Sequence, residues 1–293
     1  MQLFQEKYWA IDYGFTKRIE PMLMNGKLQI TPRLPLAEFT SNKASSVLTG
    51  LTNAKYFGGG AFIINGVVVM PVIGSTTTHG DNCTLAYSDL EYVIALMENN
   101  PEAKGMVMRM DTPGGAVTGL NRLSKIIKNS SKPIGYSVEG LCCSAGMYQA
   151  AFGDFVFVEE ANTTTLGSIG VLQILVDQSA ALEKQGLKVT IQRGPKSNNK
   201  ALGNSIEGYS EEFFAEETKI LGKIEADFHK VMKAGRPNIS EQIWTDEAKT
   251  YTGAEAIKLG LADAVATLEE SIQYVSNMNG KRKKYSKPVK YGF

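Results

Sequence analysis

Hydrophobic and polar residues follow two different periods between residues 56 and 275. Short apolar runs rich in β-branched residues, typical of buried strands, occur at 67–73, 105–110, 133–138, 155–158 and 188–191. Segments with apolar residues three and four positions apart, typical of amphipathic helices, follow several of these runs. Strands and helices that alternate with short connections predict an α/β fold, with a parallel sheet flanked by helices.

The helical segments differ in length and in the signals that bound them. One is predicted at 88–99 with Ser88 as a candidate N-cap, one runs from Leu120 to Ile127, and a third begins near Cys142. A long helix is predicted at 210–233, with one apolar face wide enough to dock on the core or on another subunit. That face comprises Phe213, Phe214, Ile220, Leu221, Ile224, Phe228 and Val231.

Before the first of these helices, an Asn65-Gly66 pair stands between two β-branched runs. This pair predicts a tight hairpin turn.

Composition narrows the class of protein. With 43% hydrophobic and 21% charged residues over 293 positions, the chain is typical of a folded globular protein and unlike a disordered one. Three cysteines cannot build a disulfide framework, so a reducing compartment is expected. The two histidines, His79 and His229, stand in no metal-binding motif, and no metal site or cofactor is predicted.

Charge and hydropathy at the two ends predict a central domain with extensions. Residues 281–293 carry six basic and no acidic side chains, although the whole chain has a net charge of only +1. We interpret 276–293 as a basic flexible tail, either a plain solubilising end or a contact for nucleic acid or an acidic partner. Residues 1–55 are predicted as an N-terminal extension of the domain at 56–275.

Neither the first residues nor the most apolar run predicts insertion into a membrane. Residues 1–13 include Glu6, Lys7 and Asp12 and have no apolar core, unlike a signal peptide. The most apolar run, 61–74, is shorter than the roughly 20 residues that span a bilayer. A soluble, cytoplasmic protein is therefore expected.

Candidate chemistry lies in three glycine-containing segments at the ends of predicted strands, where open α/β sheets bind ligands. In 111–115, the amides of Gly114 and Gly115 suit an oxyanion site, although a tight turn would need the same residues. In 140–146, Ser144 at a helix start is a candidate nucleophile or a plain N-cap, and Cys142 and Cys143 are ordinary small buried residues or, less plausibly, nucleophiles. The third segment, 167–170, is uninformative alone.

A serine nucleophile needs a base. Neither His79 nor His229 has an obvious orienting acid, which disfavours a Ser-His-Asp triad. A lysine serves as a base where burial keeps its amine neutral, and Lys196 and Lys200 follow the last predicted strand. Taken alone, either is equally explained as a solvated loop lysine.

Taken together, the motifs resemble the signal peptide peptidase A family of serine peptidases, which includes the capsid-assembly proteases of tailed phages. The matching segments occur in the family's order over about 200 residues. They are 66–74, 111–115, 143–148, 166–171, 251–256 and 259–263.

This resemblance implies a ClpP/crotonase-like fold and a serine-lysine dyad. By motif, Ser144 matches the nucleophile, Gly114 and Gly115 match the oxyanion turn, and Ser168 matches a serine that helps to hold the lysine. Lys200 matches the base because Gly203 and Asn204 follow it as in phage members of the family, while the spacing from the preceding strand favours Lys196 instead.

The resemblance also implies a function: an endopeptidase that forms an acyl-enzyme on phage or prophage capsid or scaffold proteins. A homo-oligomeric ring is expected, with dyad residues contributed by neighbouring subunits, in the host cytoplasm or procapsid. The alternatives are a peptidase that degrades signal or membrane peptides, an inactive capsid component, a crotonase-type acyl-CoA enzyme, and a cysteine peptidase using Cys142 or Cys143.

Overall fold

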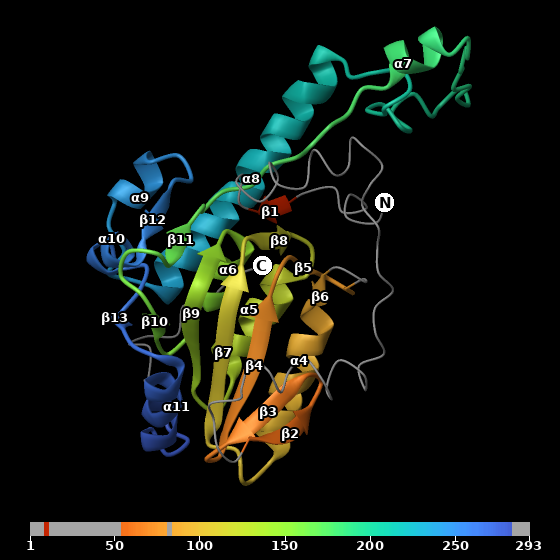
Figure 1. The fold of residues 1–293 in the computed structure, drawn as a ribbon. Helices are drawn as coiled ribbons and strands as arrows, with labels where there is room; N and C mark the ends of the chain where they lie inside the picture. Colours follow the sequence, from red (N-terminus) through yellow and green to blue (C-terminus); the bar gives the residue numbers. More distant parts are fainter. Residues whose placement is uncertain (1–8, 12–53, 81–83, 283–293) are drawn as a thin grey trace.

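The computed structural model describes residues 9–11, 54–80 and 84–282, and a mostly parallel sheet forms the centre of the molecule (Figure 1). From edge to edge its strands are β12 (Thr250–Thr252), β11 (Thr165–Gly167), β9 (Ile134–Cys143), β7 (Gly105–Thr112), β4 (Val67–Ile73), β3 (Ala61–Ile64) and β2 (Lys55–Gly58). β10 (Val156–Val158) lies parallel to the first half of β9 and pairs on its other side with β13 (Ala264–Val265). β4, β7, β9 and β11 are parallel, whereas β2, β3 and β12 run antiparallel to their neighbours.

Side chains alternate between two buried layers on the faces of this sheet. In β4, Val68 and Met70 join one hydrophobic cluster, and Val67 and Val69 join the other. The helices α4 (Tyr87–Asn99), α5 (Leu120–Asn129) and α6 (Ala145–Ala150) cover the first face, and α11 (Leu268–Asn277) covers the second. Burial on both faces is typical of parallel sheets. The predicted α/β fold, a parallel sheet flanked by helices, is confirmed.

A second, small sheet lies at one end of the main sheet. Its order is β1 (Trp9–Ile11), β8 (Gly114–Ala116), β5 (Thr76–Thr77) and β6 (Leu85–Ala86). β1 runs antiparallel to β8, and β5 lies parallel to both β8 and β6. The turn predicted at 113–115 is therefore largely a strand, which the distant segment 9–11 joins.

The hairpin predicted at Asn65-Gly66 is confirmed. These two residues join the antiparallel strands β3 and β4 and have φ angles of 53° and 81°. Positive φ at both central residues is the requirement of a type I′ turn, whose twist matches that of the paired strands.

Two predicted element boundaries are wrong. β9 does not end at Val138 as predicted but continues through Gly140 to Cys143, so the next helix begins at Ala145 rather than near Cys142. The glycine serves a close approach instead, because a Cβ at position 140 would lie 2.4 Å from Oδ1 of Asp111. The helix predicted from Ser88 begins at Tyr87, and its N-cap residue makes no side-chain capping bond.

Residues 171–210, here called the arm, extend away from the body of the molecule (Figure 1). The arm contains the helix α7 (Ser179–Lys184) and leads into α8 (Glu211–Gly235). The strand predicted at 188–191 is wrong, because that segment pairs with no other strand among the described residues. Leu187, just before this segment, and Val189 within it are 53% and 46% exposed, so their alternation does not reflect a buried face.

The long helix α8 confirms the segment predicted at 210–233, with Ser210 as its N-cap accepting a bond from the Phe213 amide. Its C-terminal half packs into the core, where the Phe228 and Tyr148 rings lie 5.0 Å apart. Its N-terminal half leaves Phe214 49% exposed. The predicted apolar face therefore docks on the body along only part of its length. The short helices α9 (Gln242–Thr245) and α10 (Gly253–Lys258) lie beside β12.

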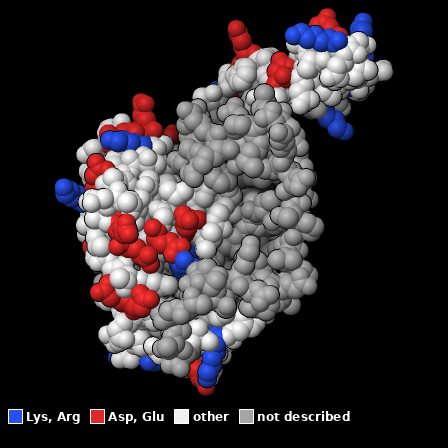
Figure 2. Space-filling model, in the orientation of Figure 1, with Lys and Arg blue, Asp and Glu red and all other residues white. Residues whose placement is uncertain are grey.

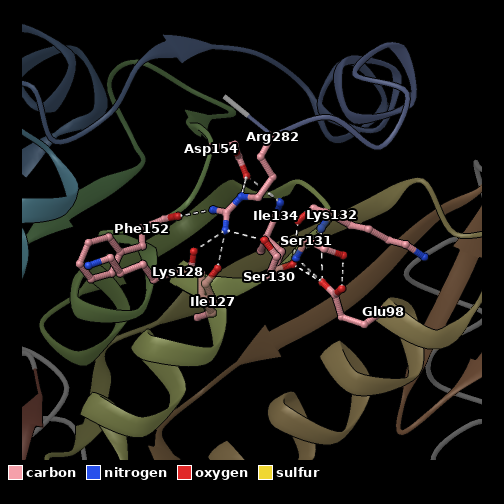
Figure 3. Close-up of polar contacts among 10 residues, drawn as sticks. All are labelled: Glu98, Ile127, Lys128, Ser130, Ser131, Lys132, Ile134, Phe152, Asp154 and Arg282. Carbon is pink, nitrogen blue, oxygen red and sulfur yellow. Dashed lines mark hydrogen bonds and ion pairs between the residues drawn. The ribbon is translucent and has the colours of Figure 1, made fainter. Parts of the chain in front are cut away.

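The boundary drawn at 276 falls inside α11, and the described structure continues to Arg282. Figure 3 shows that this guanidinium is held at the end of α5. It donates to the Asp154 carboxylate. It also donates to the carbonyls of Ile127, Lys128, Ser130 and Phe152, so the side chain is fixed in place. The interpretation of a flexible tail is therefore wrong for 276–282, and the rest of that segment lies outside the described residues.

Likewise, the boundary at residue 55 falls at the first residue of β2. Among the described residues, no helix has both the length and the apolar character that crossing a membrane requires.

Candidate active site

The three predicted glycine-containing segments meet at one end of the main sheet. The strand registers place Thr112 of β7 opposite Cys142 of β9, and Cys143 opposite Gly167 of β11. Since parallel strands end at the same edge, the segments that follow them converge there. Ser144 is therefore flanked on one side by the segment leading into β8 and on the other by the segment after β11.

Ser144 connects β9 to α6 in an unusual backbone conformation. Its φ is 50° and its ψ is −112°, a combination that costs a non-glycine residue about 1–3 kcal/mol. The amide donates to the carbonyl of Gly167 at 2.8 Å, and Oγ donates to the carbonyl of Gly170 at 3.2 Å. Its side chain makes no capping bond to α6, so the plain N-cap interpretation does not describe it. Ser144 is 1% exposed.

Gly115 is required by close packing within the small sheet. A Cβ at this position would lie 1.8 Å from the carbonyl oxygen of Thr76, the residue opposite it on β5. Any side chain at 115 would therefore push β8 away from β5. The φ of Gly115 is not positive, so the close approach of the Thr76 carbonyl is the reason that this position requires glycine.

Gly114 has a φ of 114° and is held by the residue at the end of β7. Its amide donates to Oγ1 of Thr112 at 3.1 Å. That amide, one of the two predicted oxyanion donors, is therefore occupied within the chain in this structure.

Three polar residues that the sequence analysis did not single out hold the backbone of β8 in place. They are Thr76, Tyr87 and Thr112. Tyr87 donates from its hydroxyl to the carbonyl of Ala116 at 2.7 Å, and Thr76 donates to that hydroxyl at 3.0 Å. With Thr112, they fix the backbone of β8 through buried hydrogen bonds. The one available signal was Tyr87, a tyrosine at the buried start of a helix, whose hydroxyl must find a partner.

Ser168, which the resemblance implies helps to hold the lysine, follows Gly167 at the end of β11, and in the described part of the chain no hydrogen bond joins its hydroxyl to a lysine side chain. Its φ is 53°, and its amide donates to the backbone carbonyl of Lys249 at 2.9 Å. Its neighbours Gly167 and Gly170 provide the two carbonyls that bond Ser144. Ser168 is 9% exposed, so its surroundings are already closed within one chain.

Neither candidate lysine is brought to Ser144 within this chain. Lys196 and Lys200 are both exposed and line one shallow hollow in the outer part of the arm. In the described part of the chain, neither lysine forms a hydrogen bond with Ser144, whose hydroxyl donates to Gly170. One chain therefore places the candidate nucleophile and the candidate bases on different parts of the molecule.

The other nucleophile and base candidates are poorly placed. His79 is exposed, and the ring of His229 packs 4.9 Å from the ring of Trp244 on α9. Burial raises the pKa of the Cys142 thiol to about 12, an effect that the nearby Arg236 only partly offsets. Cys142 is therefore a thiol rather than a thiolate near neutral pH, which does not suit a nucleophile. Cys143 is buried as well.

In the ranges that the structure describes, no group of three or more histidine, cysteine, aspartate or glutamate side chains is arranged to hold a metal ion.

Comparison with known proteins gives a family match over the region that holds this site. The model of peptidase family S49 matches residues 126–281, just over half of the chain. The match includes Ser144, Ser168, Lys196 and Lys200.

A curated relative extends this match to an individual protein. The capsid assembly protease C of Escherichia phage lambda is 29% identical over 230 residues, which cover 75% of this chain and 51% of that protein. The chain thus spans about half the length of this relative.

Two solved structures share part of the arrangement. A ClpP1 variant from Listeria monocytogenes has a TM-score of 0.45 at 12% identity and covers 70% of this chain and 94% of its own. An enoyl-CoA hydratase/isomerase family member has a TM-score of 0.40 at 15% identity and covers 74% and 73%.

Proposed function

Because this chain belongs to peptidase family S49, we propose that it is a serine endopeptidase in which Ser144 is the nucleophile and a lysine of the arm is the base. The observation that carries the proposal is the conformation of Ser144. A serine held at positive φ between three converging strand ends, with no capping role, is typical of a residue kept for its chemistry.

In the proposed reaction, the hydroxyl of Ser144 gives up its bond to Gly170 and transfers its proton to a neutral lysine amine. The serine oxygen then attacks a peptide carbonyl, and backbone amides of the β8 segment stabilise the oxyanion. The lysine ammonium then returns this proton to the leaving nitrogen, so that the C–N bond breaks, the amine product leaves, and an acyl-enzyme and a neutral lysine remain. Water, activated by the same lysine, hydrolyses the ester.

For the oxyanion site, Gly115 and Gly114 are the proposed donors. The amide of Gly114 would have to leave Thr112 when substrate binds, because it donates to that hydroxyl in the free chain. Loss of one such donor is expected to reduce the rate roughly 100- to 1000-fold.

The base must come from a neighbouring copy of the chain if Lys200 serves this role. Lys200 is exposed on the arm, and a lysine becomes a neutral base only where burial removes its water. The arm suits a subunit contact because it exposes several apolar side chains. These are Ile174, Val176, Leu187 and Val189. Figure 2 shows both basic and acidic side chains at the arm's outer end, so the exposed apolar side chains, rather than charge, support contact between the arm of one copy and another copy.

Mixing two inactive variants tests this arrangement. Ser144→Ala and Lys200→Ala should each abolish hydrolysis of a fluorogenic peptide. In a 1:1 mixed oligomer, about one quarter of the sites would combine an intact serine with an intact lysine from its neighbour. Activity should therefore return to about one quarter of that of the unmixed wild type.

The matched control is a mixture containing Lys196→Ala in place of Lys200→Ala. With Lys200 as the base, Lys196→Ala should be active alone, and its mixture should keep about one half of wild-type activity, because every chain retains Lys200. Loss of activity in Lys196→Ala alone, with recovery in its mixture, would move the base to that residue. If Ser144→Ala retains wild-type activity, the serine mechanism is wrong.

As substrates, we propose capsid or scaffold proteins, because the lambda relative is named for capsid assembly. Incubation of the purified protein with the scaffold and capsid proteins of its own genome should give new termini, identified by mass spectrometry. The same products with Ser144→Ala would contradict the proposal.

A further inference from the structure

The segment of the arm that carries Lys200 folds around the side chain of Arg193. The Arg193 guanidinium donates from Nε to the carbonyl of Lys200 at 2.7 Å and from Nη2 to the carbonyl of Ala201 at 2.9 Å. Its two terminal nitrogens also bond the two oxygens of the Glu207 carboxylate, at 3.2 and 2.5 Å. An exposed ion pair alone contributes little to stability, but a bidentate pair that also binds backbone carbonyls has a fixed geometry. One guanidinium therefore ties the backbone of the candidate base to a carboxylate further along the chain.

Asn204 completes this network from inside the loop. Its Oδ1 accepts bonds from the amides of Ile206 and Glu207, both at 2.9 Å, so the backbone forms a tight turn there. Its Nδ2 donates to the carbonyl of Ala201 at 2.8 Å and to the Glu207 carboxylate at 3.1 Å. The hydrogen bonds from Arg193 and Asn204 lower the pKa of Glu207, so this carboxylate is charged near neutral pH.

The loop is also attached to the two helices of the arm (Figure 1). A Cβ at Gly203 would lie 2.0 Å from Cε2 of Phe213, in the first turn of α8, so only glycine allows this approach. On the other side, the carbonyl of Ser205 accepts from the amide of Gln178, the N-cap residue of α7, at 2.7 Å. The backbone that follows Lys200 is therefore held from both sides.

The backbone around Lys196 is held differently. Its neighbours form two turn bonds, from the Ser197 amide to the Gly194 carbonyl at 3.0 Å and from the Lys200 amide to the Ser197 carbonyl at 2.9 Å. Within the described part of the arm, no side chain donates a hydrogen bond to the backbone of residues 194–199. Of the two candidate bases, Lys200 is thus the one whose backbone the side-chain network fixes.

We propose that Arg193 is a positioning residue, which fixes the backbone at Lys200 so that the arm presents the lysine amine from one place. This inference rests on the proposed function, in which a lysine of the arm is the base. A lysine side chain has four flexible carbon–carbon links, so its amine is placed accurately only when its own backbone is fixed. Arg193 acts through Lys200 rather than on the peptide, so its loss should lower kcat and leave KM unchanged.

Arg193→Gln in the full-length protein tests the proposal. We expect hydrogen exchange at the amides of Ile206 and Glu207 to quicken at least about tenfold, because the loop loses its central contact. The kcat for a fluorogenic peptide should fall at least about tenfold, with KM within about twofold of wild type. The matched control is Arg122→Gln, because Arg122 of α5 also forms an ion pair, with Glu91 at 2.7 Å, but lies outside the arm. It should change neither exchange nor kcat.

Two further variants separate the geometry of the clamp from its charge and from folding. Arg193→Lys keeps the positive charge but cannot bond two carbonyls and a carboxylate together, so kcat should remain low. Glu207→Gln keeps the shape of the side chain and weakens only the ion pair, so its kcat should lie between those of wild type and Arg193→Gln. Wild-type kcat in Arg193→Lys would show that charge alone matters and would overturn the positioning role.

Failure of this inference is distinguishable from failure of the proposed function. Wild-type exchange in Arg193→Gln overturns the clamp, even if the protein hydrolyses peptides. Quickened exchange with wild-type kcat, where Ser144→Ala is inactive, overturns the positioning role and leaves the serine peptidase in place. A fall in kcat that accompanies smaller particles in analytical ultracentrifugation assigns Arg193 to assembly and also overturns the positioning role. If Ser144→Ala retains wild-type activity, the proposed function fails, and the positioning role fails with it.

Discussion

At the scale of single residues, the candidate site depends on backbone conformation and on close contacts between backbone atoms. Ser144 holds a strained conformation, and Gly115 meets the carbonyl of Thr76 at a distance that leaves no room for a Cβ. The order of motifs made both positions predictable as candidates. The contacts that explain them were not predictable, because Thr76 is 39 positions away from Gly115 and belongs to a strand of two residues.

We predict that Gly115→Ala lowers both stability and activity. The added methyl group would overlap the carbonyl oxygen of Thr76, so β8 must shift and the proposed oxyanion amides with it. Destabilisation of about 1–3 kcal/mol is expected from denaturant unfolding, with a larger proportional loss in peptidase rate.

Gly222→Ala is the matched control for that substitution. Gly222 lies within α8, where a Cβ would meet no atom within 4 Å. Alanine there should stabilise the protein by about 0.5–1 kcal/mol and leave the rate unchanged. Equal stability of the two alanine variants would contradict the packing argument.

At the scale of elements, hydrophobic periodicity predicted most of the strands and helices of the body but not the arm. Met106, Met108 and Met110 alternate with Val107 along β7 because both faces of that strand are buried. In the arm, Leu187 and Val189 show a similar alternation without a sheet to pack on. A local pattern cannot reveal whether a partner strand exists, and this is why the strand at 188–191 was predicted wrongly.

Arg282 joins the end of α11 to the end of α5, and we predict a large loss of stability when it is removed. Its side chain is 11% exposed and that of Asp154 is fully buried, at 2.9 Å separation. Arg282→Ala would remove the cationic partner of the buried Asp154 carboxylate, which would keep the bond from the Ile134 amide, and would remove the donor to several backbone carbonyls, at a cost of about 3–5 kcal/mol. Denaturant unfolding measures this loss.

The neighbouring Lys281 provides the control, since it is exposed. Lys281→Ala should unfold like the wild type. A chain in which Arg282→Ala also unfolds like the wild type would show that this guanidinium does not anchor the C-terminal segment.

Glu98 connects α4 to the segment after α5 and makes that connection dependent on pH (Figure 3). Burial alone would raise the pKa of Glu98, but hydrogen bonds from the Ser130 and Ser131 hydroxyls and the Ser131 and Lys132 amides outweigh it and lower the pKa. A carboxylate with a lowered pKa stabilises the folded state above its unfolded pKa. That stabilisation is lost as the pH falls through the lower, folded value.

We therefore expect Glu98→Gln to be less stable than wild type at pH 7, with the difference shrinking as the pH falls below about 4. Urea unfolding at several pH values measures it. A difference that grows in acid would contradict the assignment.

At the scale of the whole molecule, the candidate nucleophile and the candidate bases lie on different parts of the described chain. Ser144 lies at the end of the main sheet, and both candidate lysines lie on the arm. Sequence motifs predicted which residue types to consider, but the arrangement of separate subunits has no signature in local periodicity. The identity of the base therefore stays a prediction.

We predict that Val176→Asp prevents assembly without unfolding the body. Val176 is 57% exposed on the arm, and a charge there would be buried unpaired in the proposed subunit contact. Analytical ultracentrifugation should show smaller species, and circular dichroism should be unchanged.

Tyr92→Asp is the control for assembly, because Tyr92 is also 57% exposed but lies on α4, away from the arm. It should assemble like the wild type. Assembly of Val176→Asp into wild-type particles would remove the arm from the interface.

The strained backbone of Ser144 limits the thermal stability that the protein can reach while it keeps this serine. Ser144→Gly would relieve its unfavourable φ and ψ, and the variant should melt at a higher temperature than the wild type. In the proposed mechanism it would also be inert. At this one position, thermal stability and the proposed chemistry therefore favour different residues.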